Sequence, residues 1–358
     1  MNIFVYGTTA ELIKIFPIFS RLDRAEYVLI STGQQPEGLS NLERVMAVKP
    51  DYSFRNAADL PLTKVYQVLI WSIRTSIKLV RLLSDSKFDK KKSTVIVHGD
   101  TITSTLAAFF GFLFRFRIAH IEAGLRSRDL LNPFPEEIDR IITSFFATLH
   151  FAPGETAVKN LVGKRGEVIN THFNTVVDAL LDVPKVSPQG LDLPGEFALV
   201  CLHRTELLSN KSVLGQTLMT LNKISQRIHV VMVIDPLTEF NLRHQANYLL
   251  LEESRLVTIV RKLVYPEFQY LMQNCEFLVT DSGGQQEEAA QLGLPCIVHR
   301  RATERFEGLD ANVVLSLWSQ AALVSFADDY SQYRRPLKVI NRSPSDIIVD
   351  RLRLVDLD

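Results

Sequence analysis

Ionisable side chains follow several short apolar runs of the sequence, at the point where each run ends. Asp100 follows TVIVHG, Glu122 ends RIAHIE, and His203 follows FALVCL. Each run has the length and the β-branched, apolar composition of a buried strand. Carboxylates and imidazoles are the usual groups for moving protons, and ligands of parallel sheets bind beyond the carboxyl ends of the strands. The pattern therefore predicts a site for acid–base chemistry at these strand ends.

Each of these residues also has a structural interpretation. Asp100 precedes a helical run, where it could serve as an N-cap. Glu136 and Glu137 begin another predicted helix, where carboxylates stabilise the helix dipole, and taken alone they favour that explanation. His203 could be part of a surface ion pair. Glu122 is different, because an acid at the end of an apolar strand and before Ala-Gly is a poor choice for either a strand or a turn.

A second candidate site lies in TDSGGQQEEAA, which follows the apolar run CEFLVT. The segment Ser282-Gly283-Gly284 allows a ligand to approach the backbone closely, and the helix expected after it offers free N–H groups to an anion. Glu288 lies about one helical turn further and suits sugar hydroxyls, and Arg305 suits phosphate. The alternative is an ordinary glycine turn before an amphipathic helix. The pattern favours a nucleotide-sugar phosphate site.

The elements that position these residues alternate as strand, turn and helix along the whole chain. Such alternation is typical of parallel sheets covered by helices on both faces. The segment VPKVSPQGLDLPGE contains three prolines and two glycines and has no apolar period, which is typical of a linker. We therefore expect two doubly wound α/β domains over residues 1–182 and 197–340, facing a central cleft. Residues 183–196 form the linker, and residues 341–358 form a final helix.

Composition excludes several classes of function. The 358 residues include 40 basic and 40 acidic side chains, so no net charge favours nucleic acid. The three cysteines have no metal-ligand spacing and indicate free thiols in a reducing compartment. The apolar run ITSTLAAFFGFLF is too short to span a bilayer. We expect a cytoplasmic protein without a membrane span, with peripheral membrane contact through the following FRFRI as the minor alternative.

Several longer motifs resemble the UDP-N-acetylglucosamine 2-epimerase family. They are HGDTITSTLAA, HIEAGLRSRDLLNPFPEEIDR, LHFAPGETAVKNL, FNTVVDAL, TDSGGQQEEAAQLGLP and ATERFEG. The resemblance implies two Rossmann-like domains of the glycosyltransferase-B type, with UDP held mainly by the second. It also implies a final helix that crosses back to the first domain, and a homodimer formed through the first domain.

The resemblance further implies a reaction and a set of residues. The family interconverts UDP-GlcNAc and UDP-ManNAc by eliminating UDP to give 2-acetamidoglucal and adding UDP back, without a metal or a redox cofactor. By motif, the acid–base carboxylates are Asp100, Glu122 and Glu136, joined by the catalytic or phosphate-contacting His203. The residues expected to bind the UDP-sugar are Lys14, Arg140, Ser282, Gly283, Gly284, Glu288 and Arg305.

The sequence departs from the family pattern at several positions. Thr9 stands where the family has an arginine that reaches the nucleotide, and residues 34–37 and 235–237 differ from the motifs that form its activator site. We therefore expect catalysis without activation by a second substrate molecule. Three alternatives remain open: a hydrolysing epimerase that releases ManNAc and UDP, a glycosyltransferase that uses the same UDP-sugar, and a non-catalytic UDP-sugar sensor.

Overall fold

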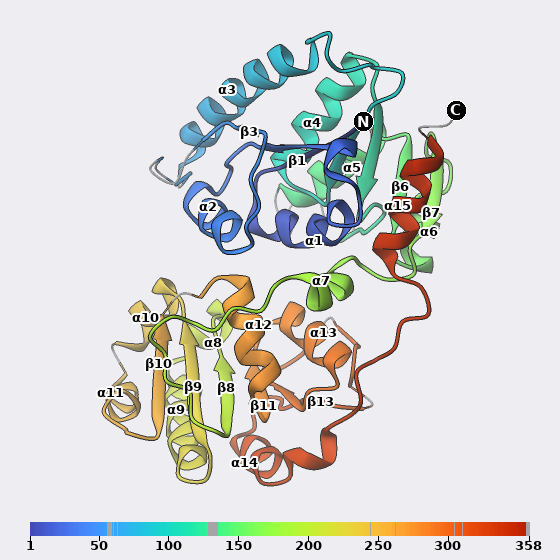
Figure 1. The fold of residues 1–358 in the computed structure, drawn as a ribbon. Helices are drawn as coiled ribbons and strands as arrows, with labels where there is room; N and C mark the ends of the chain where they lie inside the picture. The colour runs from blue at the N-terminus through green and yellow to red at the C-terminus, as the bar shows by residue number, and fades with distance from the viewer. Residues whose placement is uncertain are drawn as a thin grey trace. The chain divides into compact units, whose positions relative to one another are not determined.

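The chain divides into two compact units in a computed structural model (Figure 1). Unit 1 comprises Met1–Pro184 together with Ile340–Asp358, and unit 2 comprises Lys185–Val339. No helix or strand lies between residues 183 and 196. The structure describes residues 1–55, 59, 61–62, 64–127, 135–243, 245–261, 263–303, 305–309 and 311–355.

Unit 1 is built on a parallel sheet in the order β3-β2-β1-β4-β5-β6-β7. Every residue of β1 and β4 is buried, as expected for central strands covered on both faces. The chain leaves β1 in one direction along the sheet and β4 in the other, so these strands flank the switch point. The strands are β1 (Asn2–Tyr6), β2 (Tyr27–Ser31), β3 (Tyr52–Ser53), β4 (Thr94–His98), β5 (Arg117–Ile121), β6 (Leu149–Ala152) and β7 (Glu167–Asn170).

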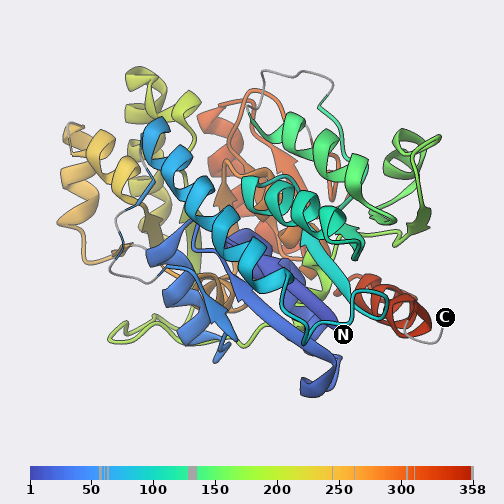
Figure 2. The same ribbon diagram turned by 90° about the horizontal axis from the view of Figure 1, so that it is seen from above.

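Helices cover both faces of this sheet. Three of them, α3, α4 and α5, run side by side over one face, as Figure 2 shows. On the other face α1 packs against α2, α7 and α15. The helices are α1 (Thr9–Phe19), α2 (Pro36–Val45), α3 (Val65–Leu83), α4 (Ile102–Leu113), α5 (Glu136–Phe146), α6 (Glu155–Asn160), α7 (Val176–Asp182) and α15 (Pro344–Val355).

The last helix, α15, returns to unit 1 and is fixed there by polar contacts. The side-chain oxygen of Ser343 accepts from the backbone N–H of Asp346 at 3.2 Å. This hydrogen bond caps the start of the helix. Asp178 of α7 accepts from the hydroxyl of Ser343 and the backbone N–H of Ser345, both at 2.8 Å. Arg21 after α1 donates to Asp346 at 2.8 Å.

Unit 2 repeats the same architecture with a parallel sheet in the order β10-β9-β8-β11-β12-β13. Its strands are β8 (Phe197–Cys201), β9 (His229–Ile234), β10 (Val257–Arg261), β11 (Phe277–Thr280), β12 (Cys296–Val298) and β13 (Val313–Leu315). Its helices are α8 (Thr205–Leu208), α9 (Lys211–Ser225), α10 (Pro236–Leu242), α11 (Ala246–Glu252), α12 (Tyr265–Asn274), α13 (Gly283–Leu292) and α14 (Gln320–Asp328). The prediction of two doubly wound α/β units is confirmed.

The apolar run at Ile102–Phe114 forms α4 and the turn after it. Ala107 and Ala108 pack in the core against β1, β4 and α3. No helix in the described part of the chain combines the length and apolar character that a membrane crossing requires.

Candidate functional site

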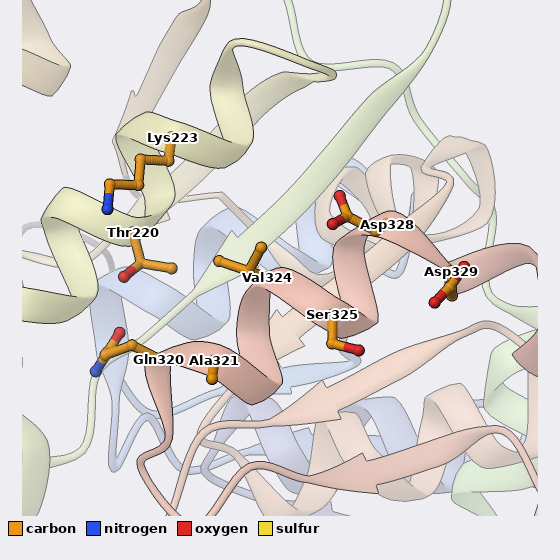
Figure 3. A pocket seen from close by; sticks show the side chains of 8 residues that line it. All are labelled: Thr220, Lys223, Gln320, Ala321, Val324, Ser325, Asp328 and Asp329. Carbon is orange, nitrogen blue, oxygen red and sulfur yellow. The ribbon is translucent and has the colours of Figure 1, made fainter.

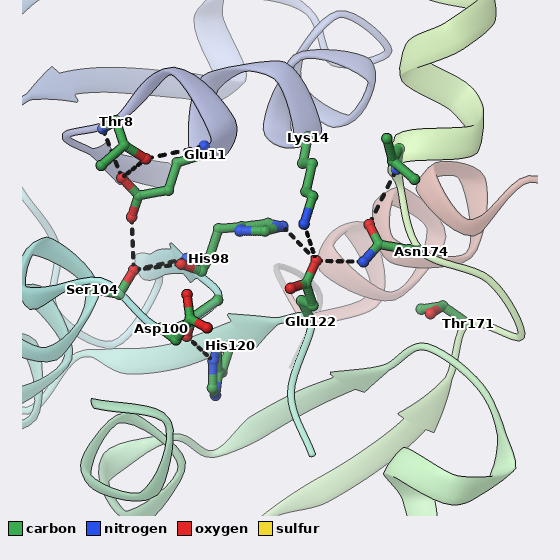
Figure 4. Close-up of polar contacts among 12 residues, drawn as sticks. Thr8, Glu11, Lys14, His98, Asp100, Ser104, His120, Glu122, Thr171 and Asn174 are labelled. Atoms are coloured by element: carbon green, nitrogen blue, oxygen red, sulfur yellow. Dashed lines mark hydrogen bonds and ion pairs between the residues drawn. The ribbon is translucent and has the colours of Figure 1, made fainter. Parts of the chain in front are cut away.

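Glu122 is the centre of a polar cluster at the carboxyl ends of the strands of unit 1 (Figure 4). It directly follows β5 and has a φ of +64°, a left-handed conformation that is uncommon for a residue other than glycine. The ammonium group of Lys14, on α1, donates to Oε2 of Glu122 at 2.5 Å. The side-chain amide of Asn174, just before α7, donates to the same oxygen. Nε2 of His98, the last residue of β4, lies 3.6 Å from it.

These neighbours keep Glu122 ionised. Burial alone would raise the pKa of the Glu122 carboxyl, but the charge of Lys14, followed by His98 and the hydrogen bonds from Lys14 and Asn174, lowers it to about 2. Burial lowers the pKa of His98 to about 4, so this imidazole is neutral near pH 7. Nε2 of His98 has no hydrogen-bond partner among the described residues.

Asp100 lies beside this cluster and pairs with Arg140 of α5. Burial raises the pKa of the Asp100 carboxyl above its usual value, although the Arg140 guanidinium opposes the shift. The N-cap of α4 is Thr101, whose side chain accepts from the backbone N–H of Ser104 at 3.1 Å. The N-cap interpretation of Asp100 is therefore wrong, because the neighbouring threonine occupies that position.

A buried carboxylate, Glu11, ties the loop after β1 to the loop that carries Asp100. One oxygen of Glu11 accepts from the backbone N–H groups of Gly7 at 2.8 Å and Thr8 at 2.9 Å. The other accepts from the hydroxyls of Thr101 at 2.5 Å and Ser104 at 3.0 Å. Because Glu11 is 1% exposed and both of its oxygens are hydrogen-bonded, it cross-links the two loops.

His120 supports the Gly99–Asp100 turn from within the sheet. It lies on β5, is fully buried, and its Nε2 is 2.8 Å from the carbonyl oxygen of Gly99. Burial lowers the pKa of His120 to about 3, so the ring is neutral. With the proton on Nε2, the ring donates to that carbonyl. The hydrogen bond from His120, and one from the Gly99 N–H to the Ile121 carbonyl oxygen at 2.9 Å, tie Gly99 to β5, and the φ of Gly99 is +66°.

Glu136 is the first residue of α5, which agrees with its structural interpretation as a dipole-stabilising acid. Its Oε2 is buried and has no hydrogen-bond partner in the parts of the chain that the structure describes. Its charge, together with that of Asp100, contributes to raising the pKa of Asp139 to about 6, after the larger effect of burial. Among the contacts of the described residues, none joins Glu136 to Glu122.

The corresponding edge of unit 2 holds His203, which follows β8. The fully buried carboxylate of Asp281, after β11, accepts from the backbone N–H of His203 at 3.0 Å and from that of Arg204 at 2.9 Å. The Nδ1 atom of His203 lies 3.8 Å from the same carboxylate. Asp281 thus fixes the turn from which the half-exposed imidazole projects.

The helix expected after Ser282-Gly283-Gly284 is α13, but it begins at Gly283, so both glycines lie in its first turn rather than before it. Ser282 is the N-cap residue, but its side chain accepts no capping hydrogen bond. Among the described residues, the nearest atom to a Cβ added at Gly284 would be the hydroxyl oxygen of Ser282, at 3.9 Å. Packing against these residues therefore does not require glycine at position 284.

Glu288 lies on α13, and Arg305 approaches the same helix at Glu287. Glu288 is 8% exposed and accepts from the phenol of Tyr265 at 3.1 Å and the amide of Gln269 at 2.8 Å. Arg305 lies 3.4 Å from the carboxylate of Glu287. Glu288 is therefore held in a defined orientation, whereas Arg305 is an exposed residue paired with a neighbouring acid.

A hollow of about 490 Å³ lies elsewhere in unit 2, between α9 and α14 (Figure 3). None of the predicted site residues lines it, and its polar groups include both signs of charge. The lining residues are Thr220, Lys223, Gln320, Ala321, Val324, Ser325, Asp328 and Asp329. The described residues also contain no group of three or more His, Cys, Asp or Glu side chains that could hold a metal ion.

Comparison with known proteins shows which family the chain belongs to. Residues 19–329 match the family model described as UDP-N-acetylglucosamine 2-epimerase. The chain belongs to the UDP-N-acetylglucosamine 2-epimerase family. A curated UDP-N-acetylglucosamine 2-epimerase from Campylobacter jejuni is 30% identical over 94% of this chain and 92% of its own length. The predicted assignment to this family of isomerases is confirmed.

Solved structures of epimerases agree with this family assignment. The UDP-GlcNAc 2-epimerase of Methanocaldococcus jannaschii is 25% identical, with a TM-score of 0.81 and complete coverage of both chains. The UDP-GlcNAc 2-epimerase of Neisseria meningitidis, solved with UDP-GlcNAc bound, is 27% identical with a TM-score of 0.74, over 99% of this chain and 100% of that one. The glycosyltransferase-B fold class is confirmed for this epimerase-family chain.

Four polar residues at these sites received no role in the sequence analysis: His98, Asn174, Glu11 and Asp281. His98 and Asp281 lie at strand ends, as the predicted residues do, so the same sequence pattern could have identified them. Asn174 lies in the FNTVVDAL motif. Only the three-dimensional fold brings it to Glu122, 52 positions away in the chain.

Proposed function

We propose that this protein is a UDP-GlcNAc 2-epimerase that interconverts UDP-GlcNAc and UDP-ManNAc. The observation that carries the proposal is the convergence of Lys14, His98 and Asn174 on Glu122, with Asp100 and Arg140 beside them. Family membership gives the reaction class, and this cluster provides the acid–base groups that the reaction needs.

The reaction is an elimination followed by an addition. A base removes the C2 proton, the C1–O bond to UDP breaks, and a C1=C2 double bond forms, which gives 2-acetamidoglucal and UDP. Addition of UDP to C1 with a proton delivered to the opposite face of C2 gives UDP-ManNAc. Because the proton leaves one face of C2 and is delivered to the other, the reaction needs two proton-transfer groups. We assign these roles to Glu122 and Asp100, with Glu136 as the third carboxylate.

Binding of UDP is assigned to unit 2. Ser282, Gly283 and Gly284 stand at the start of α13, and Gly284 is exposed. This segment suits a pyrophosphate, which accepts hydrogen bonds from N–H groups at a helix N-terminus. Glu288, oriented by its two hydrogen bonds, suits the ribose hydroxyls. His203 and Arg305 of unit 2 would stabilise the charge on the departing UDP. Lys14 and Arg140 are the basic residues of unit 1 that we assign to the UDP-sugar.

We further propose that the enzyme releases UDP-ManNAc rather than free ManNAc and UDP, and that it lacks activation by a second substrate molecule. The first part rests on the sequence His203-Arg204-Thr205-Glu206, which resembles the non-hydrolysing branch, and the second on the altered segments 34–37 and 235–237. The hydrolysing epimerase remains the alternative, distinguished by release of free ManNAc and UDP. The three free, buried cysteines are consistent with a cytoplasmic setting.

We also propose that the enzyme acts as a homodimer through the outer face of α3, α4 and α5. Exposed apolar side chains gather there, on helices that lie side by side. They are Val65, Tyr66, Leu69, Ile70, Ile73, Ile77, Phe109, Phe112, Leu113, Ile141, Ile142 and Phe145. Sedimentation of the wild type and of Ile73→Glu tests this, because a charge on this face should give monomers. A wild-type monomer at micromolar concentration would contradict the proposal.

Incubation with UDP-GlcNAc, followed by separation of the nucleotide sugars, tests the proposed activity. The wild type should form UDP-ManNAc to equilibrium, and Asp100→Asn and Glu122→Gln should slow the reaction by about 10²-fold or more, as loss of a proton-transfer group does. Glu253→Gln, at an exposed position on unit 2, is the matched control and should retain full activity. Full activity in both amide variants would refute the assignment of the acid–base groups.

A further inference from the structure

The contacts of Glu122 conflict with its role as a base. Lys14, His98 and Asn174 all approach the same oxygen, Oε2. A carboxylate whose pKa lies at about 2 binds a proton too weakly to remove one efficiently from carbon near neutral pH, because base strength follows pKa. In the observed arrangement, Glu122 is therefore paired with a positive charge and is a weak base.

The three neighbours of Oε2 differ in what they can do. The Lys14 side chain is 24% exposed, and it carries its charge on a flexible four-carbon stem. His98 and Asn174 are neutral groups anchored by the protein: His98 is 3% exposed, and Asn174 also accepts from the backbone N–H of Val176 at 3.1 Å. Among the three, Lys14 alone combines a charge with the freedom to move.

We propose that Lys14 is a substrate-controlled restraint on Glu122, a role that rests on the proposed function of the site. The pyrophosphate of the UDP-sugar draws the Lys14 ammonium away from Oε2, while His98 and Asn174 keep the carboxylate in place. Binding of the anionic ligand thereby converts Glu122 from a paired carboxylate into a general base. Lys14 is thus a positioning residue for the base as well as a phosphate ligand.

The surrounding charges support this exchange. Within the described part of the chain, the ionisable groups that face Glu122 are Lys14 from α1, His98 from β4 and Asp100 from the loop after β4. Asp100 is itself paired with Arg140 of α5. When Lys14 leaves, Glu122 keeps His98 and Asn174 as uncharged neighbours and has a carboxylate nearby, and both conditions raise the affinity of Glu122 for a proton.

The pH dependence of catalysis by Lys14→Gln shows whether Lys14 leaves Glu122 when the substrate binds or stays paired with it. The acid limb of kcat/KM reports Glu122 in the free enzyme, and the acid limb of kcat reports it in the complex. In the wild type we expect the limb of kcat/KM to lie at least one pH unit below that of kcat. In Lys14→Gln the acid limb of kcat/KM should move up by at least one pH unit, because the free enzyme then lacks the Lys14 charge. The acid limb of kcat should not move, so the two limbs should coincide.

The control is Lys159→Gln, which makes the same charge change at an exposed position on α6 and should move neither limb. Equal shifts of both limbs in Lys14→Gln would show that Lys14 remains on Glu122 in the complex and would overturn the inference. Unmoved limbs would overturn it as well.

A second measurement needs no turnover. Carbon-13 NMR of protein labelled at the glutamate carboxyl carbons, with Glu122→Gln to identify the signal, reports the protonation of Glu122 directly. We expect no titration above pH 4 in the free protein or with uridine, and a titration midpoint above pH 4 with UDP. UDP that binds without changing the Glu122 signal would overturn the inference alone. Failure of UDP to bind would overturn the proposed function and the inference with it.

Discussion

Replacement of His120 by glutamine tests whether the buried histidine beneath the Gly99–Asp100 turn is neutral. His120 is fully buried and its Nε2 lies 2.8 Å from the Gly99 carbonyl oxygen. Glutamine has no proton to gain between pH 8 and pH 5 and offers a similar N–H donor. The variant should therefore remove one titrating group and keep the hydrogen bond.

The expected magnitude follows from the two pKa values. The ordinary histidine pKa of 6.5 applies to the unfolded chain, and burial lowers the pKa to about 3 in the folded protein. Between these values the unfolded chain binds more protons, so the free energy of unfolding falls as the pH drops below about 6.5. At pH 5 the loss is about 1.5 pH units at ~1.4 kcal/mol per unit, or about 2 kcal/mol.

The assay is denaturant unfolding at pH 8 and pH 5, followed by the fluorescence of Trp71. Trp71 lies in unit 1 and Trp318 in unit 2, so a Trp318→Phe background lets the signal report unit 1 alone. The loss of unfolding free energy between the two pH values should be about 2 kcal/mol smaller in His120→Gln than in its parent. Taking the difference between pH values cancels any destabilisation that the substitution causes at both.

An exposed histidine provides the control. His172→Asn should leave the pH dependence of unfolding close to that of the parent. If His120→Gln also leaves that dependence unchanged, His120 is not held neutral in the fold. The support it gives to the Asp100 loop would then need another explanation.

Three further substitutions test the packing and the two sites. In Gly124→Ala, the added Cβ would lie 2.3 Å from the carbonyl oxygen of Ala157, at a residue whose φ is +84°. The variant should therefore destabilise unit 1 by about 2 kcal/mol or more in the same Trp71 assay, and unchanged stability would contradict the close approach. Asp281→Asn should lower kcat by roughly 10- to 100-fold in steady-state kinetics, because the charged acceptor that holds the His203 turn is lost; unchanged kcat would contradict that role. Glu288→Gln should weaken UDP binding by about 10-fold in calorimetry, as expected for loss of a charge-assisted hydrogen bond, and an unchanged affinity would remove Glu288 from the ribose site.

Local sequence patterns predicted the fold well because the strands are short and buried on both faces. Runs such as NIFVY and TVIVH leave few alternatives to a central parallel strand. Helix boundaries are harder to predict: the apolar period from Leu62 to Leu83 predicts a helix over that range, and the helix found there, α3, begins at Val65. The alternative interpretation of Asp100 as an N-cap is wrong because Thr101 is equally suited to the role and lies one residue closer to the helix.

The candidate site was predictable as a list of residues, whereas its contacts were not. Lys14 and Glu122 are 108 positions apart, and their ion pair depends on how β1 and β5 are placed in the sheet. The sequence suggested a phosphate ligand at Lys14, and the structure shows the same ammonium on a carboxylate. The left-handed backbone at Glu122 is likewise a tertiary property, since no local pattern requires it.

Proton NMR of the wild-type protein with UDP-GlcNAc in deuterated water tests the central claim most directly. Elimination and readdition must exchange the C2 proton with solvent, so UDP-ManNAc should appear with deuterium at C2, and the remaining UDP-GlcNAc should gain deuterium there as well. UDP-ManNAc that retains its C2 proton would contradict the proposed mechanism. No reaction and no exchange at saturating UDP-GlcNAc would contradict the proposed function itself.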